Sequence, residues 1–225
     1  MKIAEDIRSL LAFYDAFGFE YLPLRIKQCT ASVSVSAGDK ATSLRALREE
    51  IGECRRCKLS VKRTNVVFGE GRPDAELMLI GEAPGAEEDL QGRPFVGDAG
   101  MLLSRLIERM QLRRDDVYIA NVVKCRPPMN RDPEPDEIEK CRGFLARQIE
   151  IIRPKVIMSL GRIATSTLIG NPKIKITSVR GKFFNYQGIP LMPTFHPAYL
   201  IRNPRDKWLT WNDAQKVLAK MRACD

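Results

Sequence analysis

Four cysteines constrain the fold of this chain more than any other feature, because they require distant segments of the sequence to meet. Cys54 and Cys57 form a Cys-x2-Cys pair, and Cys125 and Cys141 follow with fifteen residues between them. A Cys-x2-Cys pair places two thiolates on one tight turn, and two more thiolates complete four-coordination around zinc or an iron-sulfur cluster. The pattern therefore predicts a metal centre bound by these four side chains.

The spacing of the second pair helps to identify the metal. Structural zinc sites usually present two short Cys-x2-Cys knuckles, whereas the residues between Cys125 and Cys141 include four prolines. This wide spacing favours a four-iron four-sulfur (4Fe-4S) cluster. A zinc ion, or a set of core or redox thiols without metal, remains as an alternative. Cys29 and Cys224 lie near the ends of the chain and are expected to be ordinary thiols.

Composition and charge narrow the class of protein. A chain of 225 residues with 44% hydrophobic residues suits one globular domain with an extension. The 37 Lys and Arg residues exceed the 28 Asp and Glu residues, and the net charge of +9 favours a polyanionic partner. No apolar run approaches the roughly 20 residues that a membrane span needs. We expect a monomer in the cytoplasm, where thiolates stay reduced and can bind a metal.

The first 42 residues are predicted to form a helical extension and a linker. Apolar residues recur with helical spacing over about residues 1–20, and a polar stretch rich in Ser and Ala spans residues 30–42. A short helix capped by Thr42 or Ser43 leads to the first cysteine pair. The sequence thus predicts a domain over residues 43–225, with an extension that could dock on the domain or on a replication or repair protein.

The rest of the chain alternates between short apolar strands and amphipathic helices. Such alternation predicts a three-layer α/β/α fold around a central, mainly parallel four-stranded sheet. Strands are predicted over residues 77–80, 117–123 and 156–160 and in a hairpin that turns at Gln187-Gly188 and ends at Thr194; helices are predicted over residues 98–111, 136–152, 163–168 and 206–221.

Three segments with polar residues lie at the end of predicted strands or directly after them, and ligands of such sheets bind beyond the carboxyl ends of the strands. The segments are Gly81-Glu82-Ala83-Pro84-Gly85, the stretch from Asn121 to Lys124, and His196-Pro197-Ala198-Tyr199-Leu200. A fourth segment, Gly92-Arg93-Pro94-Phe95-Val96-Gly97, leads into a helix. His196 is the one histidine of the chain, so any histidine chemistry must involve it.

Taken with Glu88-Asp89, Cys125-Arg126-Pro127-Pro128 and the four cysteines, these segments closely resemble the family 4 uracil-DNA glycosylases. The resemblance covers about residues 44–221, in the order and spacing of the family. It implies the hydrolysis of the N-glycosidic bond between uracil and deoxyribose in DNA, which leaves an abasic site. It also implies uracil-containing DNA as the partner, a 4Fe-4S cluster on Cys54, Cys57, Cys125 and Cys141, and a three-layer α/β/α fold.

The resemblance also assigns roles to single residues. Phe95 would stack on the flipped base, and the Asn121 amide would accept a hydrogen bond from uracil N3-H and donate one to O4. His196 would donate a hydrogen bond to uracil O2 as negative charge develops there. The backbone amides of Gly81, Glu82 and Ala83 would help to stabilise the same charge. Leu200 would insert into the base stack, beside Tyr199 and Arg202, which would contact the DNA.

Two features leave the catalytic assignment open. Other branches of the superfamily place Asp or Asn where this chain has Ala83, so Glu82 and Glu88 are the available carboxylates. Either could act directly in catalysis or shape the pocket. Gly85 stands where some relatives have a tyrosine that blocks thymine, so rejection of the thymine methyl group falls to another residue, with Glu88 as the candidate.

Basic residues crowd the two cysteine loops, and most of them would be ordinary solvated surface. A functional interpretation is that the cluster fixes two basic loops that bind DNA phosphates, a contact that positions the protein without reading the sequence. The residues concerned are Arg55, Arg56, Lys58, Lys62, Arg63, Arg126 and Arg131. Two other classes stay open: a cluster-bearing protein that binds or cross-links uracil-DNA without turnover, and a nucleic-acid-binding module without a reaction.

Overall fold

The computed structural model describes residues 37–223. Its helices are α2 (Ala37–Ile51), α3 (Ala86–Gln91), α4 (Asp98–Arg109), α5 (Pro135–Ile152), α6 (Arg162–Ile169), α7 (Ile176–Val179), α8 (Pro197–Arg202) and α9 (Lys207–Arg222). Its strands are β1 (Glu70–Gly71), β2 (Leu77–Gly81), β3 (Tyr118–Asn121), β4 (Val156–Leu160), β5 (Phe184–Tyr186) and β6 (Ile189–Thr194). The predicted strands and long helices are therefore confirmed, with small shifts at their ends.

The strands form one sheet in the order β1-β3-β2-β4-β6-β5. The four central strands are parallel, and the edge strands β1 and β5 are antiparallel to their neighbours. The predicted four-stranded sheet is thus the parallel centre of a wider sheet. The predicted hairpin at Gln187-Gly188 joins β5 to β6, whereas the two-residue strand β1 is too short to give a periodic signal.

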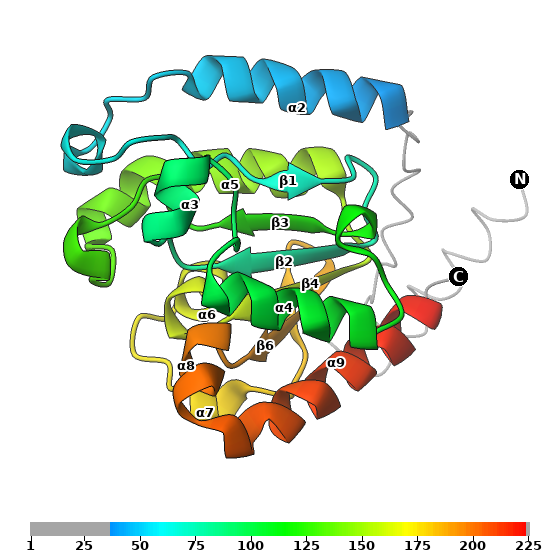
Figure 1. Cartoon of the computed structure of the whole chain (residues 1–225). Helices are drawn as coiled ribbons and strands as arrows, with labels where there is room; N and C mark the ends of the chain where they lie inside the picture. The colour runs from blue at the N-terminus through cyan, green and yellow to red at the C-terminus, as the bar shows by residue number, and fades with distance from the viewer. Residues whose placement is uncertain (1–36, 224–225) are drawn as a thin grey trace, which may run out of the picture. The chain divides into compact units, whose positions relative to one another are not determined.

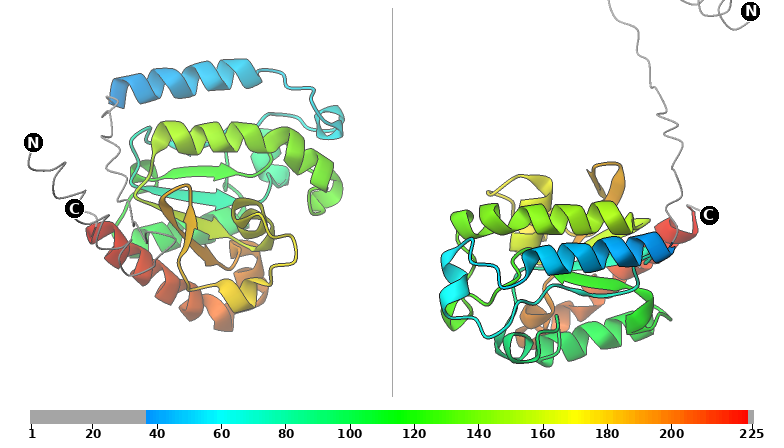
Figure 2. Two further views of the ribbon diagram at one scale, coloured as in Figure 1. Left: turned by 180° about the vertical axis from the view of Figure 1, so that it is seen from behind. Right: turned by 90° about the horizontal axis from the view of Figure 1, so that it is seen from above.

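Successive residues of the strands point to opposite faces of the sheet, which divides the core in two. Met78 and Ile80 pack with residues of α2, α5 and α6, whereas Leu77 and Leu79 pack with residues of α4 and α9. All four side chains are buried. Figures 1 and 2 show the resulting layers of helix, sheet and helix. The predicted three-layer fold is confirmed.

Helix α2 begins earlier than predicted. It starts at Ala37, and the Thr42 hydroxyl donates to the Gly38 carbonyl oxygen one turn back, at 3.1 Å, instead of capping the helix. Part of the predicted linker is therefore helical, because its Ala and Lys residues favour a helix. The helix predicted over about residues 1–20 lies outside the described residues, and the division into extension and domain stays a prediction.

The sheet brings the polar segments to one edge. The arrowheads of β2 and β3 point to the side on which α3 and the loop before α5 lie (Figure 1). Strands β4 and β6 are parallel to them and end at the same edge. Within the described part of the chain, no helix is long and apolar enough to cross a bilayer.

Candidate active site

A cavity of about 460 Å³ opens at the carboxyl edge of the parallel strands. Its walls come from the segments after β2, β3 and β6, from the loop before α5 and from the start of α4. The lining includes the predicted site residues Glu82, Ala83, Glu88, Phe95, Asn121, His196, Tyr199 and Arg202. The structure therefore brings together residues that are more than one hundred positions apart in the sequence.

Gly81 lies next to the cavity, where the side chains of Asn121 and Phe95 pack closely against its backbone. A Cβ atom at this position would lie 2.4 Å from the Asn121 side-chain oxygen and 2.5 Å from the Phe95 ring. Both distances are far below van der Waals contact, so only glycine allows Asn121 and Phe95 to approach so closely. The role predicted for Gly81 in the pocket therefore has a steric basis.

Asn121 ends β3 and is 1% exposed. Its side-chain Oδ1 has no hydrogen-bond partner among residues 37–223, and no other buried side-chain N or O atom of this part lacks one. An unpaired buried acceptor typically costs about 1–3 kcal/mol. The residue lines the cavity, which makes its side-chain amide the candidate contact for a polar group of a ligand.

The Glu88 carboxylate holds two of the cavity loops. One oxygen accepts hydrogen bonds from the amides of Val96 and Gly97, at 2.8 and 2.9 Å, and the other accepts one from the Gly85 amide, at 3.0 Å. The residue is buried. Both oxygens are occupied by backbone donors, so the geometry favours a pocket-shaping role for Glu88 over a direct catalytic one.

Phe95 sits on the loop that Glu88 holds. Its backbone has a φ of 52°, in the left-handed region that a bulky residue rarely adopts, and its side chain is 5% exposed. The loop packs against Gly100 of α4, where a Cβ would lie 2.0 Å from the Phe95 carbonyl oxygen. The ring centroid lies 5.7 Å from that of His196. Phe95 is thus fixed as one flat wall of the cavity.

His196 is held in one tautomer. Its Nδ1 accepts a hydrogen bond from the Ala198 amide at 3.1 Å, so a neutral ring carries its proton on Nε2. Burial, followed by the nearby positive charge of Arg202, lowers the pKa of His196 to about 4, whereas Glu88 acts weakly in the opposite direction. At neutral pH the ring is therefore a neutral hydrogen-bond donor through Nε2-H.

Glu82 is partly buried beside a second carboxylate. Burial, followed by repulsion from Asp132, raises the pKa of Glu82 to about 7, and the positive charge of Arg162 offsets part of this shift. Asp132 lines the same cavity and forms an ion pair with Arg162. Glu82 is thus poised to exchange a proton near neutral pH, which suits an acid or base.

Tyr199 and Leu200 both lie on α8, where each side chain makes contacts within the protein. Tyr199 stacks on Phe195, with ring centroids 4.7 Å apart, and its hydroxyl donates to Asp206 at 2.7 Å. Leu200 is 4% exposed and lines a separate apolar cavity between α4, α8 and α9. The described conformation buries the Leu200 side chain, and its insertion into DNA stays a prediction.

The four predicted metal ligands share one neighbourhood of the α2 and α5 side of the core. The Arg56 guanidinium donates to Cys54 Sγ, the Arg63 guanidinium to Cys125 Sγ and the Lys124 amide to Cys141 Sγ, each at 3.3 Å. Burial raises the pKa of the Cys125 thiol to about 11. Among residues 37–223, no group of three or more His, Cys, Asp or Glu side chains is arranged to hold a metal ion.

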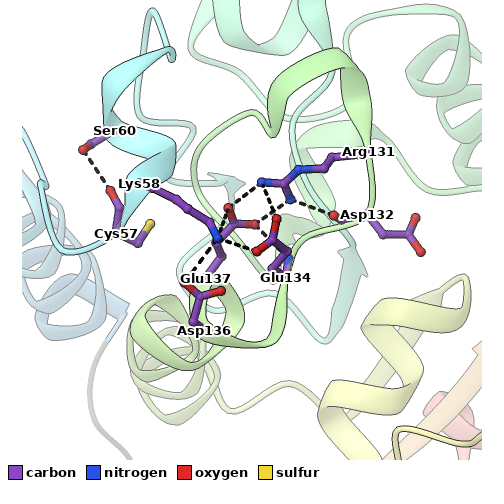
Figure 3. Close-up of polar contacts among 8 residues, drawn as sticks. All are labelled: Cys57, Lys58, Ser60, Arg131, Asp132, Glu134, Asp136 and Glu137. Atoms are coloured by element: carbon purple, nitrogen blue, oxygen red, sulfur yellow. Dashed lines mark hydrogen bonds and ion pairs between the residues drawn. The ribbon is translucent and has the colours of Figure 1, made fainter.

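The buried Glu137 carboxylate joins the two basic loops. It accepts hydrogen bonds from the Arg131 guanidinium at 2.7 and 2.8 Å and from the Glu134 amide at 2.8 Å, and Lys58 forms an ion pair with Glu134 (Figure 3). The charges of Lys58 and Arg131 are therefore already paired within the chain. This arrangement weakens the hypothesis that these two residues bind DNA phosphates.

Arg63 also has an internal role. Its guanidinium donates to the Cys54 carbonyl oxygen at 2.6 Å, and its side chain is 5% exposed. Such a buried side chain does not reach a phosphate on the surface. The phosphate contact predicted for the cysteine loops thus rests on the residues that remain exposed, such as Arg55 and Lys62.

Some site residues were not found from the sequence. The cavity is also lined by Asn130, Arg131 and Asp132. Of these three, the sequence indicated only Arg131, as a basic residue. The length of the proline-rich loop between Cys125 and Cys141 is the sequence feature that could have indicated them, because this loop crosses the carboxyl edge of the sheet. The ion pair between Asp132 and Arg162 joins this loop to α6, and no local pattern predicts it.

Comparisons with known proteins agree with this geometry. Residues 68–220 match the model of the uracil DNA glycosylase superfamily. A type-4 uracil-DNA glycosylase of Thermotoga maritima is 53% identical over 69% of this chain and 81% of its own length. One of Sulfurisphaera tokodaii is 49% identical over 78% of this chain and 83% of its length. A type-5 uracil-DNA glycosylase of Pyrobaculum aerophilum is 30% identical over 58% of this chain and 64% of its own length.

The protonation of His196 can be measured directly, because the chain has one histidine and its ring gives a single set of NMR signals. We expect a titration midpoint near pH 4 in the folded protein, since burial disfavours the imidazolium. In urea, the midpoint should return to about 6.5. The contribution of His196 to the free energy of unfolding should therefore fall as the pH drops from about 6.5 towards 4. A midpoint near 6.5 in the folded protein would contradict the lowering of the His196 pKa by burial.

Proposed function

Since the chain belongs to the uracil DNA glycosylase superfamily, we propose that it is a DNA-repair glycosylase that flips uracil out of DNA. It hydrolyses the N-glycosidic bond, releases free uracil and leaves an abasic site. The flip costs a few kcal/mol of unstacking, which the contacts in the cavity offset. A monomer acting in the cytoplasm on uracil-containing DNA completes the proposal.

The unpaired Oδ1 of Asn121 carries this proposal. Uracil presents N3-H as a donor beside the O4 acceptor, which matches the oxygen and the nitrogen of a side-chain amide. Cytosine presents an acceptor at N3 and a donor at C4, so both contacts would be lost. Asn121 is buried, and solvent would not compensate for the lost contacts. The residue therefore selects uracil over cytosine.

The neutral His196 stabilises the departing base. Breaking the C-N bond leaves negative charge on the uracil oxygens and positive charge on the sugar. A fixed Nε2-H donor at O2 lowers the barrier, because it is strongest when that charge develops. The hydrogen bond from Ala198 to Nδ1 orients the ring for this task. Backbone amides of residues 81–83 support the same charge.

Glu82 supplies the carboxylate for the attacking water. Its neighbour Ala83 has no polar side chain, and Glu88 is occupied by backbone amides, so Glu82 is the cavity carboxylate next to β2 that is suited to bind water. In its ionised form it accepts a proton from water and stabilises the cationic sugar. In its protonated form it does neither.

The remaining residues of the cavity position the substrate. Phe95 stacks on the flipped uracil, and Glu88, fixed by three amides, is a rigid wall that rejects the thymine methyl group. Tyr199 and Arg202 line the cavity and contact the DNA. Leu200 takes the place of the flipped base, which requires α8 to release the side chain from its apolar packing.

The four cysteines fit a 4Fe-4S cluster. In such a cluster each thiolate binds a different iron atom, so the four sulfurs need not converge on a single ion. Three N-H donors, two of them on arginines, already point to the sulfurs of Cys54, Cys125 and Cys141 and favour their anionic forms. These four residues would hold the cluster, which would cross-link the two cysteine loops, and the loop after Cys125 forms part of the cavity wall.

Uracil release tests the proposal. With an oligonucleotide that contains one deoxyuridine, we expect several turnovers of free uracil per protein molecule. The substitution His196→Ala should reduce kcat/KM by about 100- to 1,000-fold, because it removes one donor from the developing negative charge. DNA with thymine in place of uracil should release no base.

The controls separate the competing functions. A stable complex with uracil-DNA but without free uracil would mean a binding or cross-linking protein, and the absence of any interaction would reject the assignment altogether. Equal uracil release by the native protein and the His196→Ala variant would remove the histidine from the mechanism.

The pH dependence of the reaction tests Glu82. The carboxylate is ionised above a pKa of about 7, so kcat/KM should rise with pH below this value, by up to about tenfold per unit, and level off above it. His196 stays neutral over this pH range and therefore adds no second ionisation to the pH profile of kcat/KM. The substitution Glu82→Gln should lower the activity and flatten the profile. A Glu82→Gln variant that keeps the native pH profile would exclude this assignment.

A further inference from the structure

Lys124 is a fully buried lysine between the cavity and the cysteines, and none of the roles above involves its side chain. It follows Asn121 by three residues, precedes Cys125 directly, and is 0% exposed. An isolated buried ammonium is very costly, so proteins keep one only where its hydrogen bonds and charge partners offset that cost. The surroundings of Lys124 therefore indicate what it holds in place.

The ammonium group joins β3 to α5. Its Nζ donates to the Asn121 carbonyl oxygen at 2.8 Å and to Gln148 Oε1 at 2.6 Å. The Gln148 amide nitrogen donates in turn to the Phe68 carbonyl oxygen at 2.9 Å and to the Tyr118 hydroxyl at 3.2 Å. A buried network of hydrogen bonds favours one arrangement of the backbone. Here the network includes the backbone carbonyl group of Asn121.

The acceptors of Lys124 are neutral oxygens, so its charge needs another partner. Burial lowers the pKa of Lys124 to about 8, whereas negative charge on the sulfurs of Cys141 and Cys125 acts in the opposite direction. The Lys124 amide also donates to Cys141 Sγ at 3.3 Å. The lysine thus contacts the proposed cluster site through its backbone and the uracil-recognition residue through its side chain.

Asn121 needs such support because its recognition atom makes no hydrogen bond within the described residues. The backbone after it is fixed by hydrogen bonds from Val122 to the Gly81 carbonyl oxygen, at 3.0 Å, and from Val123 to that of Glu82, at 3.1 Å. These contacts leave the carbonyl group of Asn121 to the ammonium. Loss of the ammonium would free the peptide group that sets the direction of the side-chain amide.

We propose that Lys124 is a positioning residue for base recognition, which holds the Asn121 peptide so that the side-chain Oδ1 meets uracil N3-H. This inference rests on the proposed function. It assigns to the lysine a role that is distinct from general stability: its effect on the reaction passes through the Asn121 side chain.

A double-mutant cycle tests the inference, with uracil release from single-deoxyuridine DNA as the readout. The variants are Lys124→Met, which keeps similar volume without charge, Asn121→Ala, and the two combined. The backbone carbonyl at position 121 is present in all of them, so a purely structural effect of Lys124 persists after Asn121→Ala. Lys220→Met, at an exposed lysine of α9, controls for the loss of a positive charge.

We expect Lys124→Met to lower kcat/KM by about 10- to 100-fold in the native background, the range for a hydrogen bond to a charged group. In the Asn121→Ala background the same substitution should cost less than about threefold, because the group that it positions is gone. Iron content per chain and the thermal unfolding midpoint are measured for every variant, so that loss of the cluster or of the fold is seen separately.

Equal losses in both backgrounds would overturn the inference, because Lys124 would then act independently of the Asn121 side chain. If Lys124→Met does not fold, the pair Lys124→Met with Gln148→Met replaces it, since removing both partners leaves no unpaired amide oxygen at Gln148. No uracil release by the native protein would reject the proposed function itself, together with this inference.

Discussion

The pocket depends on one buried carboxylate that binds backbone amides. Glu88 accepts hydrogen bonds from Gly85, Val96 and Gly97, and so fixes the loop after β2 against the loop that carries Phe95. A charge-assisted hydrogen bond of this kind is stronger than a neutral one, and three of them offset the left-handed backbone of Phe95. Two other buried carboxylates hold loops in the same way: Asp89 accepts from the amides of Thr64 and Asn65, and Glu137 accepts from that of Glu134.

The polar groups of the site therefore fall into two sets. Those with internal partners, such as Glu88, Glu137 and Lys124, build and hold the loops. Within residues 37–223, the Asn121 Oδ1, the His196 Nε2-H and the Glu82 carboxylate have no such partner, and we propose that these groups serve a flipped uracil, its developing charge and a water molecule. The proposed chemistry follows from this separation. The neutral histidine is part of it, because an imidazolium would be repelled by Arg202 and would pay for its burial.

The fold was largely predictable, because the strands are short apolar runs and the helices α4 and α5 have apolar residues at helical spacing. The site motifs were also recognisable, since they directly follow the strands. What the sequence could not show is which partner each polar residue has. Glu82 and Glu88 look equivalent until the backbone amides at Glu88 are seen, and Lys58 and Arg131 read as free charges until Glu134 and Glu137 are placed beside them. Such pairings are set by tertiary structure, and so is the burial of Leu200.

The most direct test of this account compares Glu88→Gln with Glu87→Gln, at the neighbouring exposed glutamate. A glutamine offers one acceptor oxygen in place of two and turns a donor towards the remaining amides, so the two loops lose their common anchor. We expect kcat/KM for uracil release to fall by about tenfold or more in Glu88→Gln, which corresponds to roughly 1.4 kcal/mol, and to stay near the native value in Glu87→Gln. Equal, native-like activity of both variants would contradict the claim that Glu88 holds the pocket.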